Sequence, residues 1–350
     1  MFEIGNANFF KSFIDRNAVR RLRIFIFNLV IMLAVFCPVI ASATDLRGIS
    51  ITARDNMTGA NREIKLYRQM HAVIIGIDKY PNLSPDRQLS YAVKDAKGIE
   101  KVLQEQYSFD TFYTLYSEQA TRDGIMAVLQ GKLSGIHEDD AVFIFFAGHG
   151  TTHKDRLTGD DIGYILPYDG TFNKAEMYKN ISMTQLRDDV ARIIPAKHIY
   201  YVIDACYSGT LLAQRAGGVN PSHDYAYLQE ITDEPVRQVL TAGTDKQTVL
   251  DGGPKGHSVF TGRLIEKLEE TDDYITAAEL GEHVKRRVAS DAQGRGHTQT
   301  PRDGSLYGLG DFVFVPSANK RALEIEKEGR RLEEELAKLK AQCHLAHYFA

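Results

Sequence analysis

The feature that most limits the fold of this sequence is a regular alternation of short apolar runs and amphipathic stretches, which begins at His71. The apolar runs are rich in β-branched and aromatic residues and have the length of buried strands. They lie at residues 72–77, 112–116, 141–146, 199–203, 236–241 and 312–315. Amphipathic stretches with helix-start signals lie at 91–107, 122–133, 182–193 and 276–289, the last two with Gln185 and Glu279 placed to close capping boxes. This alternation predicts an α/β fold with a mainly parallel sheet and helices on both faces.

Composition excludes several classes of protein. The 350 residues are enough for a core of full size, and three cysteines are too few for a disulfide framework. The formal charge of -4 gives no electrostatic basis for binding nucleic acid. We therefore expect an ordinary globular domain with no nucleic-acid partner.

Residues 1–43 differ from the rest of the chain. Basic residues precede an apolar run at 24–40, and the small residues Ala41, Ser42 and Ala43 follow it. This order is typical of a cleaved signal peptide, and an uncleaved membrane anchor is the alternative. We expect export to the periplasm or the exterior, with membrane attachment only if the leader is retained.

Two further segments lie outside the alternating region. Residues 44–68 are polar and lack clear periodicity, which predicts a linker or edge segment. From 317 to 350, apolar residues step by three and four among charged ones, which predicts a helical tail, either a short coiled coil that supports self-association or a solvated single helix. The central domain is then 69–316.

Two predicted strands end in residues suited to nucleophilic catalysis. One is followed by Gly148, His149 and Gly150, and the other by Asp204, Ala205 and Cys206. If these parallel strands are adjacent, His149 and Cys206 emerge at the same edge. A histidine can take the thiol proton of a cysteine, and the amides of Gly150 and Cys206 are the expected oxyanion donors.

The chain resembles the caspase-like peptidases, specifically the bacterial branch near the metacaspases. The resemblance rests on His149-Gly150, on the run from Asp204 to Gly209, and on weaker matches in order between about Met70 and Val315. It implies a caspase-hemoglobinase fold with a six-stranded sheet and a His149–Cys206 dyad that hydrolyses peptide bonds.

The resemblance also implies a specificity. Caspases have a glutamine two residues before the cysteine, whereas this chain has Asp204, which metacaspase-like enzymes use together with an acid that matches Asp95. Carboxylates bind guanidinium or ammonium groups and repel acids, so cleavage after Arg or Lys is expected. Ala147 stands where the family often has a serine, which removes one hydrogen bond from this pocket.

No metal or cofactor is expected. Asp160, Asp161 and Asp169 could gather calcium, as in some metacaspases, but Ala213 stands where calcium-dependent relatives tend to supply an acid. The polar segment 215–237 is either a flexible surface loop or a site of self-cleavage.

The sequence thus predicts a cysteine endopeptidase that acts on proteins or peptides. The alternative is a catalytically silent scaffold of the same fold, which assembles partners through its helical tail. Retention of both dyad residues favours the enzyme.

Overall fold

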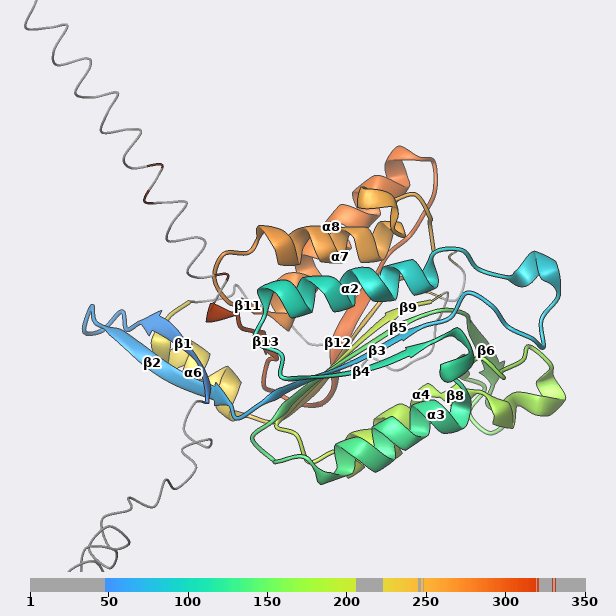
Figure 1. Cartoon of the computed structure of the whole chain (residues 1–350), viewed down its shortest axis with the longest axis horizontal. Coiled ribbons are helices and arrows are strands. Elements are labelled where there is room, and N and C mark those ends of the chain that lie inside the picture. The colour runs from blue at the N-terminus through green and yellow to red at the C-terminus, as the bar shows by residue number, and fades with distance from the viewer. Residues whose placement is uncertain are drawn as a thin grey trace, which may run out of the picture. The chain divides into compact units, whose positions relative to one another are not determined.

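The computed structural model describes residues 48–205, 223–244, 247, 249–318, 320, 329 and 331 (Figure 1). The leader, Cys206, Ala213, Arg215 and nearly all of the tail lie outside the described residues. The predictions that concern them are therefore not addressed by the structure.

A six-stranded sheet forms the centre of the described domain, in the order β12-β10-β9-β5-β3-β4. Its parallel strands are β3 (Met70–Gly76), β4 (Thr111–Tyr116), β5 (Ala141–Ala147), β9 (His198–Asp204) and β10 (Val236–Thr241). The edge strand β12 (Arg302–Gly308) runs antiparallel to β10. These strands confirm the mainly parallel sheet and five of the six expected apolar runs.

Helices cover both faces of the sheet (Figure 1). One face carries α2 (Ala92–Gln106), α7 (Val259–Glu270) and α8 (Ala277–Gly294), and the other carries α3 (Arg122–Met126) and α4 (Met183–Gln185). Helical turns continue α3 to Gly135 and α4 through α5 (Ala191–Ile193). The two-sided cover explains why β3 and β5 are buried throughout and almost entirely apolar, since neither face of these strands meets water.

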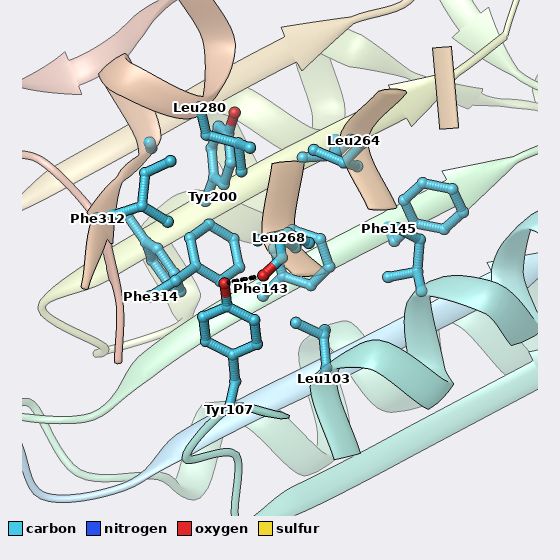
Figure 2. Close-up of a cluster of buried hydrophobic side chains, with 14 of the residues drawn as sticks. Leu103, Tyr107, Phe143, Phe145, Tyr200, Leu264, Leu268, Leu280, Phe312 and Phe314 are labelled. Carbon is cyan, nitrogen blue, oxygen red and sulfur yellow. Dashed lines mark hydrogen bonds between the residues drawn. The ribbon is translucent and has the colours of Figure 1, made fainter. Parts of the chain in front are cut away.

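The core beneath α2, α7 and α8 contains a group of packed aromatic rings among aliphatic side chains (Figure 2). Phe143, Tyr200, Phe312 and Phe314 pack with ring centroids between 4.9 and 6.5 Å apart. Tyr107 follows α2, and its hydroxyl donates to the Leu268 carbonyl oxygen at 2.7 Å. Burial of these large side chains and the Tyr107 hydrogen bond stabilise the packing of α2 and α7 on the sheet.

The helix-start signals have different outcomes. Thr276 and Glu279 form the expected capping box of α8. Ser182 accepts from the Gln185 backbone, but the Gln185 side chain accepts from Arg122 at 3.2 Å. The competing guanidinium explains why this second box is formed only in part.

The expectation that the sixth apolar run, at 312–315, belongs to the main sheet is wrong. Residues 313–314 form β13, which pairs with β11 (Ile275–Thr276) in a separate two-stranded sheet. The sixth strand of the main sheet is β12, whose edge position leaves its residues partly exposed and removes the continuous apolar run that marks an inner strand.

Residues 48–68, expected as part of a linker or edge segment, contain a β-hairpin. Strand β1 (Ile49–Arg54) pairs antiparallel with β2 (Asn61–Tyr67). The buried face of the hairpin carries Ile51, Ala53, Ile64 and Leu66, which alternate with exposed residues along the two strands. Because many of the exposed residues are charged, the segment is polar on average and the alternation is difficult to recognise in the sequence.

The hairpin packs beside α6 (Tyr225–Asp233), which lies in the described part of the 215–237 segment. The Arg62 guanidinium lies 3.9 Å from the centre of the Tyr225 ring. The described end of this segment is therefore a packed helix and not a flexible loop.

Candidate active site

The site lies where three parallel strands end side by side. Gly76 of β3 pairs with Ala147 of β5, and Ala147 pairs with Asp204 of β9. Functional groups of open parallel sheets gather at this carboxyl edge. The adjacency of β5 and β9, on which the dyad prediction depends, is confirmed, whereas Cys206 itself lies outside the described residues.

His149 follows β5 and is held from two directions. Its backbone N–H donates to the Tyr80 hydroxyl at 2.8 Å, and its Nε2 lies 2.7 Å from the Arg87 carbonyl oxygen. A carbonyl oxygen only accepts, so Nε2 carries the proton and Nδ1 of the neutral ring has the free lone pair. Burial lowers the pKa of His149, against the opposing effect of the Arg87 carbonyl. The ring is thereby prepared to accept a proton at Nδ1.

The segment that carries the Arg87 carbonyl is fixed by one side chain. Gln88 accepts from the Tyr80 backbone N–H at 2.8 Å and donates to the Tyr80 and Leu83 carbonyl oxygens, both at 3.1 Å. Tyr80 and Gln88 could not be found from the sequence, because the contacts that connect their loop with the distant end of β5 leave no periodic signal.

Two aromatic rings pack against the His149 imidazole. The centroids of Tyr80 and Phe172 lie 4.9 and 5.4 Å from it, and the Arg87 guanidinium lies 4.9 Å from the Phe172 ring centre. Gly148 permits this packing, since a Cβ there would lie 2.5 Å from the Tyr80 hydroxyl. Close packing limits rotation of the imidazole and keeps Nδ1 in one direction.

The amide of Gly150 belongs to the hairpin of β6 (Gly150–Lys154) and β7 (Asp161–Ile165), which begins next to His149. Leu166 N donates to the His149 carbonyl oxygen at 2.9 Å. Antiparallel pairs alternate between bonded and non-bonded kinds, so the Gly150–Ile165 pair is non-bonded and the Gly150 N–H faces away from β7. This direction is compatible with an oxyanion donor.

The two predicted specificity acids belong to one buried cluster. Asp95 lies in the first turn of α2 and Asp204 ends β9, and both are buried. Ser258 connects them, because its backbone N–H donates to Asp95 Oδ1 at 3.1 Å and its hydroxyl donates to Asp204 Oδ2 at 2.6 Å. The structure thus brings together two acids that are far apart in the sequence.

Two more residues complete the acidic cluster. The Thr261 hydroxyl donates to Asp204 Oδ2 at 2.5 Å, and His257 Nδ1 lies 2.8 Å from Asp95 Oδ1. Ser258 is the N-cap of α7 and accepts from Thr261 N at 2.9 Å. The family resemblance extends over these residues, but it gives them no role.

Electrostatics make this cluster a poor place for two negative charges. Burial and then the charge of Asp95 raise the pKa of Asp204 to about 7, although the hydroxyls of Ser258 and Thr261 oppose the increase. Partial burial and the charge of Asp95 also raise the pKa of the nearby Asp251. A cation entering the cluster would relieve this repulsion.

Two of the three acids considered for calcium have other partners. Lys154 lies 3.2 Å from Asp161, and Asp169 Oδ1 accepts from the Arg122 backbone at 2.8 Å. Within the described ranges, no group of three or more His, Cys, Asp or Glu side chains is placed to hold a metal ion. In the same part of the chain, no helix combines the length and apolar character needed to cross a membrane.

Comparison with curated proteins finds metacaspases. Metacaspase-1A of Neurospora crassa is 29% identical over 153 residues, which are 40% of this chain and 32% of that protein. Metacaspase-1 of Cryptococcus neoformans var. neoformans is 28% identical over 153 residues, with the same coverage of 40% and 32%. The chain thus spans about a third of the length of these relatives.

A solved structure of a Geobacter sulfurreducens protein aligns with a TM-score of 0.47 and 18% identity, and covers 69% of this chain and 94% of that one. At the level of families, residues 69–305 match the caspase domain. Since that match spans more than half of the sequence, the chain belongs to the caspase family of cysteine peptidases, as its resemblance to the metacaspases led us to expect.

Proposed function

We propose that the protein is a cysteine endopeptidase that cleaves peptide bonds after Arg or Lys. The observation that carries this proposal is the buried pair Asp95 and Asp204, connected by Ser258 at the strand end that immediately precedes Cys206 in the sequence. A cationic side chain held there would place its own carbonyl carbon near the residues that follow Asp204.

The proposed reaction begins with proton transfer from the Cys206 thiol to His149 Nδ1. The thiolate attacks the scissile carbonyl carbon, and the amides of Gly150 and Cys206 stabilise the oxyanion. His149 then gives the proton to the leaving amine as the C–N bond breaks, which leaves an acyl-enzyme. Water attacks this thioester and releases the carboxylic acid and the free thiol.

The arrangement around His149 supports its role as the base. The Arg87 carbonyl holds the Nε2 proton at 2.7 Å, so the ring presents Nδ1 as the acceptor. Burial lowers the pKa of His149, which favours the neutral imidazole that can take a proton near pH 7.

The acidic cluster supports selection of a basic side chain. Asp204 has two hydroxyl donors and an acidic neighbour, and no Lys or Arg pairs with it among the described residues. A guanidinium or ammonium group would supply the missing positive charge, and a substrate carboxylate would add to the repulsion.

Cys206→Ala tests the catalytic assignment. We expect the purified variant to lose measurable amidase activity on Arg-containing peptides, and an Arg-based thiol-reactive probe to label Cys206 in the parent protein. Cys343→Ala is the matched control and should keep both properties. Full amidase activity in Cys206→Ala would contradict the assignment.

A further inference from the structure

We propose that His257 is a positioning residue for substrate selection, which fixes the Asp95 carboxylate so that one of its oxygens faces the substrate's cationic group. This inference rests on the proposed preference for Arg or Lys and assigns a role to a residue outside the expected pair of acids.

The contacts of Asp95 divide its two oxygens unequally. Oδ1 receives a hydrogen bond from His257 Nδ1 at 2.8 Å and another from Ser258 N at 3.1 Å. A carboxylate only accepts, so the imidazole is the donor. Oδ2 has one longer contact among the described residues, 3.3 Å from Ser258 N. Oδ2 is therefore the oxygen with capacity for a ligand.

The imidazole is fixed by its packing as well as by Asp95. Asp95 and Gly98 lie three residues apart on α2 and so share a face. A Cβ on Gly98 would lie 2.6 Å from His257 Cε1, which shows that the ring occupies the space left by the missing side chain. His257 is only 8% exposed.

The backbone of His257 is held by a tight turn. Gly253 N donates to the His257 carbonyl oxygen at 2.7 Å, and His257 N donates to the Pro254 carbonyl oxygen at 3.2 Å. Gly256, with φ +74°, takes the left-handed conformation that this turn requires. The turn ends at Ser258, so one short segment positions donors to both acids.

This placement separates a positioning role from simple packing. If His257 only fills space, its replacement changes stability but not the affinity for a cationic substrate. If its N–H orients Asp95, loss of the donor raises KM for Arg substrates. It changes kcat little, because the residues that hold the His149 imidazole are Tyr80, Arg87 and Phe172.

Two substitutions at one position make the test. The side-chain amide of Asn can place a donor near the position of histidine Nδ1, whereas Leu fills comparable space without a donor. We expect His257→Leu to raise KM for an Arg peptide amide about 10-fold with kcat within about 2-fold, and His257→Asn to restore KM to within about 3-fold of the parent.

Controls separate this inference from the proposed function. Each protein is assayed with paired peptides carrying Arg or its neutral analogue citrulline at P1, and only the Arg KM should respond to His257. His137→Leu, which removes a partly exposed histidine from the loop before β5, should change neither value. Gly98→Ala is an independent route, because its added Cβ displaces the imidazole and should also raise the Arg KM.

If the parent prefers Arg over citrulline but His257→Leu and Gly98→Ala keep its KM, the positioning role is wrong and the proposed specificity stands. If the parent shows no preference for Arg, the specificity is wrong and the role of His257 falls with it.

Discussion

Two buried aspartate clusters lie at opposite edges of the same sheet. At the amino edge, Asp140 precedes β5 and accepts from Arg68 at 3.0 and 3.1 Å, from His71 at 3.1 Å and from a backbone N–H. At the carboxyl edge, Asp204 receives only hydroxyl donors among the described residues, with Asp95 as a neighbour. Asp140 is paired with a guanidinium, whereas Asp204 has no Lys or Arg partner among the described residues.

The pKa values of the two acids express this difference. Burial opposes ionisation of Asp140, but hydrogen bonds from His71 and Arg68 hold its pKa at about 2. Burial and Asp95 raise the pKa of Asp204 to about 7. The amino-edge cluster therefore contributes to stability through paired charges. The carboxyl-edge cluster instead lacks, in the described part of the chain, a positive partner for Asp204, which a bound cation can supply.

The largest expected effect comes from removing the uncompensated charge. Asp204→Asn should lower kcat/KM for an Arg peptide amide by roughly 100-fold or more, since a charge-assisted contact to the substrate is lost. Its unfolding free energy should not fall, because a buried charge is also removed. Steady-state kinetics and urea unfolding check both. Asp233→Asn, at an exposed acid, is the control. If Asp204→Asn loses stability but keeps its activity, the proposed role of Asp204 in substrate selection is wrong.

The matching change at the amino edge should affect stability instead. Asp140→Asn leaves Arg68 and His71 without their charged partner and should lower the unfolding free energy by about 3 kcal/mol. Folded protein at lower temperature should keep its KM for Arg peptides. Asp139→Asn, at a neighbouring exposed acid, should change the unfolding free energy by less than about 0.5 kcal/mol. A raised KM in Asp140→Asn would show that the two clusters are not independent.

The dependence of stability on pH should have opposite signs for the two acids. Folded Asp204 holds its proton up to about pH 7, whereas an unfolded aspartate loses it near pH 4. Its contribution to stability is therefore complete below about pH 4 and disappears as the pH rises through about 7. Asp140, with a pKa of about 2, contributes above about pH 4 and loses its contribution as the pH falls through about 2.

Urea unfolding of the parent and Asp204→Asn between pH 4 and 8 measures the first of these windows. The parent should lose stability relative to the variant as the pH rises. A difference between the two proteins that stays constant with pH would contradict the raised pKa of Asp204.

The smallest expected effect concerns the His149 side of the site. Gln88→Ala frees the segment whose Arg87 carbonyl holds His149 Nε2, and should lower kcat about 5-fold with KM nearly unchanged. Gln104→Ala, at an exposed glutamine of α2, is the matched control. An unchanged kcat in Gln88→Ala would show that the aromatic packing alone is enough to orient the imidazole.

Much of this architecture could be predicted from the sequence, because inner strands carry a local signal. The continuous apolar runs within β3, β5 and β9 predict the centre of the sheet, and the residues at the ends of β5 and β9 predict the edge that carries the candidate site. The edge strand β12 and the β1–β2 hairpin were missed, since solvent on one side dilutes their apolar pattern.

The site was predictable only in part. Asp95 and Asp204 came from the family resemblance, but Ser258 and His257 act through contacts between segments distant in the chain. Such contacts depend on the packing of α2 against α7 and on one turn at Gly256, neither of which periodicity reports.

The central claim is that the buried acids Asp95 and Asp204 select a cationic P1 side chain for the proposed cysteine peptidase. The most direct measurement compares kcat/KM of the parent protein on two peptide amides that differ only in Arg or citrulline at P1. We expect the Arg peptide to be favoured by roughly 100-fold or more, because only its guanidinium carries a positive charge that can pair with Asp204 and Asp95. Equal values for the two peptides would contradict the claim.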